Sequence, residues 1–328
     1  MGIGMHRGKP AGWLGKPGQP GSPASRGKPG HPGRRLAAQF GFFLLQNPFI
    51  NNFASGRIYQ GGLKSACTPG LNCYSCPAAA VSCPIGATQL FLAGARQSIS
   101  LYATGFLLAV GAVFGRFICG FVCPMGLAQD LLYRIKAPKL VVRLRVLRYA
   151  KYAVLALFVV VLPSIARDGL SGLGKPWFCQ YICPSGTLFG AVPLLAANDF
   201  LRQSAGALFA LKISILAGAV ALSAIVFRPF CRVLCPLGAV YALLNRVSLL
   251  HMRCDKAKCV SCGACSKACH AKIDPVAQPN APECVRCGKC VSACPHKALS
   301  YGMGGTGGAR GAGSAGGARG ARAADAQL

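Results

Sequence analysis

The sequence predicts a mainly helical fold, with about four membrane-spanning helices followed by a small α+β domain rich in cysteine. Only 13% of its 328 residues are charged, whereas a soluble domain usually carries about 25%. Several apolar segments approach the roughly 20 residues that a helix needs to cross a bilayer. The 19 cysteines fall in closely spaced runs along this long chain, which favours metal sites over a disulfide scaffold, since such scaffolds are typical of short secreted domains.

Shifts in composition divide the chain into four parts. Residues 1–35 are rich in Gly, Pro, Lys and Arg, and residues 301–328 in Gly, Ala and Arg. Neither has enough apolar side chains to form a core, so both are expected to be disordered tails. Between them lie an apolar region, 36–250, predicted to be the membrane domain, and the cysteine-dense region 251–300.

Four segments of the membrane domain are expected to span. They are residues 36–53, 97–115, 149–166 and 204–227. The first is the weakest because Gln39, Gln46, Asn47 and Pro48 interrupt it. Lys151 is expected to extend its ammonium toward the membrane surface from the end of the third. Residues 187–197 are apolar but too short to cross, and are predicted to form an interfacial or re-entrant helix.

The charge of the chain indicates how it is oriented. It has 36 Lys and Arg against 7 Asp and Glu, a balance typical of proteins that contact nucleic acid or a membrane surface. No nucleic-acid-binding signature is present, so we expect lipid and no nucleic acid as partner. The segment 124–148 holds six Lys and Arg, against three each in 55–96 and 167–203. The positive-inside rule then predicts a multi-pass protein of the cell membrane with 124–148, both termini and region 251–300 in the cytoplasm.

The cysteine-dense region repeats one spacing twice. Cys259, Cys262 and Cys265 are each three apart and are followed by Cys269, and the run Cys284, Cys287, Cys290 and Cys294 has the same pattern before Pro295. This is the bacterial ferredoxin spacing, in which the fourth cysteine of each run binds the other cluster. Two [4Fe–4S] clusters are therefore predicted in a ferredoxin-type α+β domain. The first ferredoxin set is Cys259, Cys262, Cys265 and Cys294, and the second ferredoxin set is Cys284, Cys287, Cys290 and Cys269.

Gly263 and Gly288 are expected to let the backbone turn tightly around each cluster. A pair of zinc ribbons is the alternative, because Cys-x2-Cys is also a zinc signature. The doubled four-cysteine spacing favours iron–sulfur clusters.

Three more cysteine pairs share the pattern Cys-x3-Cys-Pro. They are Cys119 and Cys123, Cys179 and Cys183, and Cys231 and Cys235. Cysteines four apart lie on one face of a helix, and the proline that follows suits the first position of a new helix. A further group contains Cys67, Cys73, Cys76 and Cys83.

The predicted topology sorts these cysteines by membrane face. The inner set, Cys119, Cys123, Cys231 and Cys235, falls at cytoplasmic ends of spans and supplies four thiolates, enough for one cluster. The outer cysteines, Cys67, Cys73, Cys76, Cys83, Cys179 and Cys183, fall on the opposite side. They are hypothesised to hold a second membrane-boundary cluster with two cysteines left over, and Cys254 remains unassigned. Disulfides or another metal are the alternative for the outer cysteines, since an outer face is often oxidising.

At this point a family resemblance emerges. The doubled run behind several spans, together with the Cys-x3-Cys-Pro pairs, resembles the NapH, NosR and CcoG group of membrane polyferredoxins. The motifs Asn72-Cys73-Tyr74-Ser75-Cys76-Pro77 and Ser82-Cys83-Pro84-Ile85-Gly86 resemble a subgroup described simply as 4Fe-4S binding membrane proteins. The resemblance covers about residues 36–300 and implies electron transfer, with quinol as a donor in some members and a flavin-binding or reductase protein as a partner.

Other cofactors and sites are not supported. None of the five histidines lies in a predicted span, so no haem is expected, and no Gly-rich nucleotide fingerprint is present. Asp130 and Asp168 stand near the membrane boundary, either as proton acceptors for a quinol or, more simply, as acids beside basic residues. His251 and His296 are expected on the surface.

Three functions remain open. The first is a membrane-bound iron–sulfur subunit that relays electrons between a quinol or ferredoxin-type donor and a reductase, without being a stand-alone enzyme. The second is a maturation factor that reduces a metal centre or thiol of another enzyme, as the CcoG-like members suggest. The third is a redox-sensing regulator, as the NosR-like members suggest.

Overall fold

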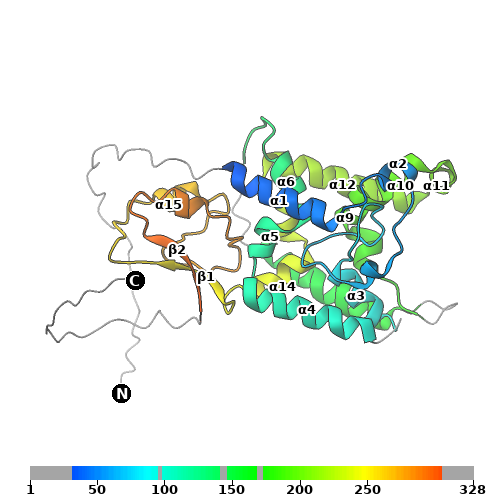
Figure 1. Cartoon of the computed structure of the whole chain (residues 1–328), viewed down its shortest axis with the longest axis horizontal. Coiled ribbons are helices and arrows are strands. Elements are labelled where there is room, and N and C mark those ends of the chain that lie inside the picture. The colour runs from blue at the N-terminus through cyan, green and yellow to red at the C-terminus, as the bar shows by residue number, and fades with distance from the viewer. Residues whose placement is uncertain (1–31, 95–97, 141–145, 168–172, 305–328) are drawn as a thin grey trace, which may run out of the picture.

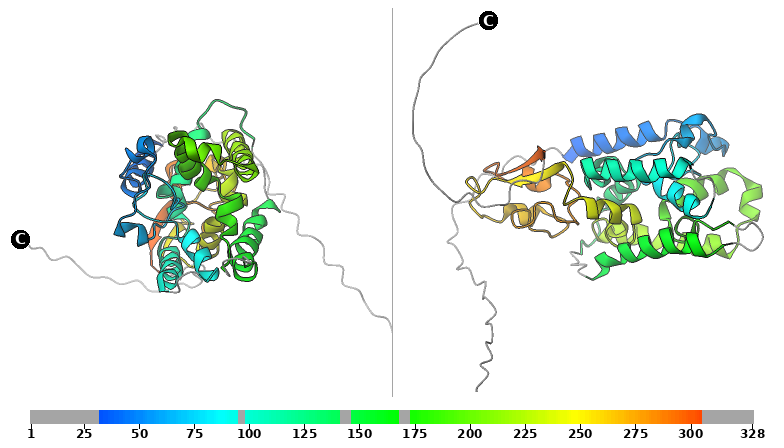
Figure 2. Two further views of the ribbon diagram at one scale, coloured as in Figure 1. Left: turned by 90° about the vertical axis from the view of Figure 1, so that its right-hand side faces the viewer. Right: turned by 90° about the horizontal axis from the view of Figure 1, so that it is seen from below.

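The computed structural model describes residues 32–94, 98–140, 146–167 and 173–304. Asp168, Arg143 and Arg145 lie outside these residues. The two expected tails, 1–35 and 301–328, also lie outside them, except for residues 32–35 and 301–304. A helical body forms one part of the molecule, and the cysteine-dense region lies at one end of it (Figure 1). The longest helices of the body run side by side, away from that region (Figure 2).

The helical body contains long and short helices. The longest are α1 (Pro32–Gln46), α4 (Ser98–Phe114), α12 (Ala207–Ile225) and a continuous helix, Leu147–Ile165. That continuous helix is built from η2 (Leu147–Tyr149), α7 (Ala150–Val154), the π-helical η3 (Leu155–Val161) and α8 (Leu162–Ile165). The shorter elements are α2 (Asn52–Ser55), η1 (Gly62–Ser65), α3 (Pro84–Leu92), α5 (Phe117–Phe121), α6 (Pro124–Leu132), η4 (Phe178–Ile182), α9 (Pro184–Gly186), η5 (Thr187–Ala191), α10 (Val192–Ala197), α11 (Asp199–Gln203), α13 (Pro229–Val233) and α14 (Pro236–Leu244).

Two of the described helices are long and apolar enough to cross a membrane, Leu147–Ile165 and Ala207–Ile225. Only 22% and 11% of their most apolar stretches are buried inside the protein, so most of their apolar surface faces outward, unlike that of the core helix of a soluble domain. Leu101–Phe114 and Pro184–Ala197 are shorter apolar helices. The expectation of four spans is therefore supported for two segments only. The first expected span ends early, at Gln46, because Pro48 disfavours helical backbone at the residue before it.

Lys151 does not extend to the membrane surface, so that expectation is wrong. Its side chain is fully buried, and its Nζ lies 2.5 Å from Oε1 of Glu283, far along the chain. A buried ammonium is stabilised by a paired carboxylate. The partner comes from the cysteine-dense region, which no local pattern around Lys151 indicates.

Four short helices begin in the same way. In α3, α6, α9 and α14 a cysteine occupies the N-cap position and a proline follows at the first helical position. The expectation that Pro124, Pro184 and Pro236 start new helices is confirmed, and Pro84 starts one as well. Because a helix N-terminus carries partial positive charge from its free N–H groups, each of these cysteine sulfurs lies where negative charge is stabilised.

The cysteine-dense region folds around a two-stranded antiparallel sheet. Strands β1 (Leu250–Cys254) and β2 (Leu299–Met303) pair so that Leu250 faces Met303, and the short helices α15 (Ala264–Ala268) and α16 (Lys289–Ser292) lie between them in sequence. Gly263 and Gly288 both have left-handed backbone, with φ of 71° and 78°. The expected tight turns at these glycines are confirmed, and they occur at equivalent places in the two cysteine runs.

Candidate iron–sulfur sites

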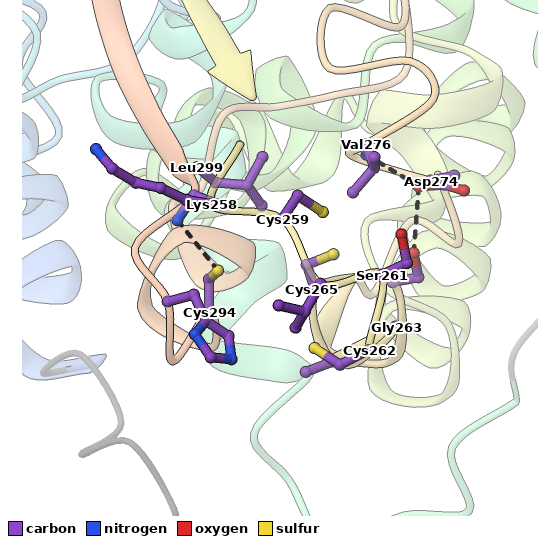
Figure 3. A pocket seen from close by; sticks show the side chains of 15 residues that line it. Lys258, Cys259, Ser261, Cys262, Gly263, Cys265, Asp274, Val276, Cys294 and Leu299 are labelled. Carbon is purple, nitrogen blue, oxygen red and sulfur yellow. Dashed lines mark hydrogen bonds between the residues drawn. The ribbon is translucent and has the colours of Figure 1, made fainter. Parts of the chain in front are cut away.

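The first ferredoxin set surrounds a hollow near the free end of the β-sheet. Its four cysteines line one cavity of ≈ 150 Å³, and Figure 3 shows them around it. The backbone N–H of Ala298 donates a hydrogen bond to the Cys294 sulfur at 3.4 Å. Cys254, which sequence reasoning left unassigned, lies against Cys259 and within electrostatic reach of Cys265 and Cys294. The structure therefore brings together the four cysteines that the spacing predicted, with a fifth thiol beside them.

The second ferredoxin set lies between the sheet and the helical body. Its four cysteines line a smaller cavity of ≈ 30 Å³ together with Phe227, which comes from the helical body. Burial and, after it, the neighbouring thiols of this set raise the pKa of Cys290 to about 12. Cys290 and Cys265 belong to one buried apolar cluster with Met252 and Leu299. The two ferredoxin sets are therefore joined by a shared core.

The inner set converges where α5, α6, α13 and α14 meet. All four of its cysteines are buried in one core cluster, although the two pairs are over 100 residues apart in sequence. Gln129 donates from Nε2 to the Cys231 sulfur at 3.0 Å, and the backbone N–H of Leu71 donates to the Cys123 sulfur at 3.4 Å. A hydrogen bond with Cys235, followed by the nearby Arg228 guanidinium, lowers the pKa of Cys231, which favours its thiolate form.

Four of the six outer cysteines also converge. The outer four are Cys73, Cys83, Cys179 and Cys183. Burial raises the pKa of Cys83, and the nearby thiols of Cys183 and Cys73 act in the same direction. Cys179 likewise lies within electrostatic reach of the other three.

The other two outer cysteines do not share the mutual contacts of these four thiols. Cys76 packs against Cys73, and its sulfur hydrogen-bonds to Oδ1 of Asn47 at 3.7 Å. Cys67 forms an isolated bridge with Ser82 and interacts with that serine rather than with a thiol. The structure therefore separates the six outer cysteines into four that converge and two that do not, which the sequence left open.

Close backbone contact joins the inner set to the second ferredoxin set. A Cβ on Gly120 would lie 2.5 Å from the Val285 carbonyl oxygen, so the residues after Cys119 and Cys284 touch directly. Arg116 is fully buried and donates to Glu283 Oε2 at 3.1 Å and to the Cys231 carbonyl oxygen at 3.1 Å. One side chain thus bridges the segments that carry both sets.

A second contact joins the inner set to the outer four. The Cβ position of Gly70 lies 3.1 Å from Cα of Cys123, and Cys73 follows three residues later. Tyr241 is fully buried beside cysteines of both groups and donates to the Pro69 carbonyl oxygen at 2.7 Å. The four cysteine groups therefore form one continuous series through the protein.

The boundary acid Asp130 is engaged in ion pairs. It accepts from Nη2 of Arg228 at 2.6 Å and from Nη2 of Arg35 at 2.5 Å, and Gln39 also donates to it. Burial acts to raise the pKa of Asp130, but the Arg228 and Arg35 guanidiniums and the Gln39 amide together outweigh it, so this pKa is lower than usual. This arrangement matches the simpler of its two expected roles, an acid beside basic residues. His251 was expected on the surface, but it is buried and accepts from Arg253 Nε at 2.8 Å, so that expectation is wrong.

The ion pair between Arg35 and Asp130 is expected to hold α1 against α6. Replacing Arg35 by glutamine removes a charged donor to Asp130, so we expect the free energy that protects α1 from local opening to fall by about 1 kcal/mol. Amide hydrogen exchange in α1 should then be roughly fivefold faster. The neighbouring Arg34 is exposed, so R34Q, which removes the same charge from the same helix, should leave exchange unchanged. Equal exchange in both variants would contradict a role for the Arg35 pair.

No group of three or more His, Cys, Asp or Glu side chains that would hold a single metal ion occurs in the described residues. The cysteines that bind a [4Fe–4S] cluster are spaced more widely than the ligands of one metal ion. The absence of such groups therefore concerns mononuclear sites and does not test the predicted clusters.

These features define a class: a cysteine-rich iron–sulfur protein in which a ferredoxin-type domain is joined to a helical body. A sequence family described as "4Fe-4S binding domain" matches residues 99–145, 152–196 and 208–253, and each match contains one Cys-x3-Cys-Pro pair. A second family of the same description matches residues 278–300. The chain thus contains ferredoxin-type 4Fe-4S binding domains.

Curated relatives are similar over part of their length. An uncharacterized protein, MJ0749 of Methanocaldococcus jannaschii, is 27% identical over 58% of this chain and 65% of its own length. The methylamine utilization ferredoxin-type protein MauN of Methylobacillus flagellatus is 26% identical over 65% of this chain and 67% of its own. The putative electron transport protein YccM of Escherichia coli is 26% identical over 54% and 49%. The chain thus spans slightly less than two thirds of the length of MJ0749. No solved structure matches this chain.

Proposed function

We propose that this chain is a membrane-embedded iron–sulfur protein that relays single electrons between a quinol or ferredoxin-type donor and a reductase partner. The observation that supports this most strongly is the continuous contact of cysteine groups: the first and second ferredoxin sets share a core, and the second touches the inner set through Gly120 and Val285. Relatives named as ferredoxin-type and electron transport proteins agree with this proposal.

The residues around the inner set fit a [4Fe–4S] cluster. Soft thiolates are the ligands that such clusters require, and here all four are buried. Cys123 and Cys235 stand at the N-termini of α6 and α14, and the other two lie within α5 and α13. Arg116 and Arg228 are fully buried beside them, where their positive charges offset thiolate charge. A bound cluster would take up and release one electron, while these side chains hold it, exclude water and limit the cost of its negative charge.

The membrane location rests on the outward-facing apolar helices. Leu147–Ile165 and Ala207–Ile225 expose most of their apolar surface, which lipid would cover. In the proposed arrangement α1 and α4, at 15 and 17 residues, accompany them as the remaining two of four spans. The ferredoxin-type domain then lies on the cytoplasmic side, which the basic segment 124–148 favours, and the outer cysteines lie toward the opposite face.

Iron and acid-labile sulfide, measured on anaerobically purified protein in detergent, test this proposal. At four irons per cluster, the two ferredoxin sets and the inner set require about 12 irons per chain, and reduced protein should give an EPR spectrum of interacting clusters. C259A should lose about four of these irons, whereas C254A, which removes the adjacent thiol outside the spacing, should lose none. A value of about 8 irons in the wild type would contradict clusters in the helical body.

A further inference from the structure

The outer four and the inner set are built on one plan. In each, one half is a cysteine followed by Pro-x-Gly-x-x-Gln: Cys83 leads to Gln89, and Cys123 leads to Gln129. The other half is a Cys-x3-Cys-Pro-x-Gly pair, Cys179 with Cys183 or Cys231 with Cys235. The sequence repeat is short and its halves are separated, so that only the structure pairs them.

The hydrogen bonds of the two groups correspond one by one. Gln89 donates from Nε2 to the Cys179 sulfur at 3.2 Å. The same Nε2 also donates to the carbonyl oxygen of the residue four positions before Gln89. Gln129 likewise donates from Nε2 to the Cys231 sulfur at 3.0 Å and to the carbonyl oxygen of the residue four positions before Gln129. Both glutamines are fully buried. In each case the glutamine of one half reaches the first cysteine of the other half.

The second halves correspond as well. The backbone N–H of Gly186 donates to the Cys183 sulfur at 3.4 Å, and that of Gly238 donates to the Cys235 sulfur at 3.3 Å. Cys73 is the fourth cysteine of the outer four, as Cys119 is of the inner set, and its sulfur lies 3.5 Å from the Cβ position of Gly190 and 3.6 Å from that of Gly186.

The outer group also contains an unsatisfied polar side chain. Asn72, which precedes Cys73, is 1% exposed, and neither its Nδ2 nor its Oδ1 has a hydrogen-bond partner within the described structure. Buried amides without partners are rare in folded proteins. A cluster bound by Cys73 would offer sulfur acceptors to the Nδ2 donor of Asn72.

We infer that the outer four bind a second membrane-boundary [4Fe–4S] cluster equivalent to that of the inner set, with Gln89 and Gln129 as matching amide donors that tune the two clusters, and with Cys67 and Cys76 excluded. This inference rests on the proposed function, because it takes the inner set to hold a cluster. Reduction places more negative charge on the sulfurs, so an N–H donor stabilises the reduced form and raises the potential.

Iron content tests which cysteines bind. The wild type should hold about 16 irons, and C183A should lose about four. The matched controls C67A and C76A, which change the same residue type on the same side, should keep the wild-type content. A wild-type content of about 12 irons that C183A leaves unchanged and C231A lowers would overturn the outer cluster while the proposed function stands. A content of about 8 would overturn both.

Redox titration followed by EPR tests the glutamines. Q89L should lower the midpoint potential of the signal that C183A removes, and Q129L should lower that of the signal that C231A removes, each leaving the other in place. Retained iron in both variants separates this effect from unfolding. Unmoved potentials in both variants, with iron retained, would overturn the assignment of the glutamines as tuning donors.

Discussion

Replacing Glu283 by glutamine is expected to lower the free energy of unfolding by about 3–5 kcal/mol, because a buried ion pair that loses one partner leaves its other charges uncompensated. Glu283 is 8% exposed and accepts from two fully buried cations, Arg116 at 3.1 Å and Lys151 at 2.5 Å. The amide keeps the size of the side chain but not its charge. Denaturant unfolding in detergent, followed by the visible absorbance of the clusters, measures the change.

An exposed ion pair supplies the control. Asp199 and Arg202 lie 2.5 Å apart with 78% and 65% of their side chains exposed, and such pairs contribute at most about 1 kcal/mol. D199N makes the same chemical change as E283Q and should therefore leave the unfolding midpoint nearly in place. If E283Q and D199N unfold alike, the buried pairs do not hold the ferredoxin-type domain to the helical body.

The spacing of residues close in sequence predicted the two ferredoxin sets and the starts of several helices. The repeated run from Cys259 to Cys294 specified both ferredoxin sets, because three closely spaced thiolates and one crossing partner are a requirement of the cluster geometry itself. The prolines after Cys123, Cys183 and Cys235 predicted helix starts for a similar reason: a proline lacks the N–H that a first helical turn leaves unpaired anyway. The structure has helices at these positions.

Contacts between distant segments were not predictable in this way. Nothing near Lys151 or Arg116 in sequence indicates Glu283, which lies 132 and 167 residues away. Nothing in the sequence near Gln89 or Gln129 indicates that either side chain contacts a sulfur. Only the packing of distant segments brings each glutamine to its cysteine. The choice among the outer cysteines depends on the same long-range packing. The shared Cys-Pro-x-Gly-x-x-Gln pattern was the one signal available in the sequence.

Replacing Gly120 by alanine is expected to separate the inner set from the second ferredoxin set. The new Cβ would stand 2.5 Å from the Val285 carbonyl oxygen, a backbone atom that cannot rotate away. Overpacking of this kind costs about 1–3 kcal/mol, and the strain would be relieved by moving α5 away from the segment that carries Cys284. If both sets hold clusters, as proposed, EPR of the reduced protein should show a weaker magnetic interaction between them.

Gly105 provides the matched comparison, because a Cβ there meets nothing within 4 Å. In G105A the helix α4 should gain about 0.5–1 kcal/mol from the better helix former, and the EPR interaction should be that of the wild type. The pair of variants thus separates a general effect of alanine in a helix from an effect on this one contact. A G120A protein with full iron content and an unchanged magnetic interaction would show that this contact does not control the distance between the two sets.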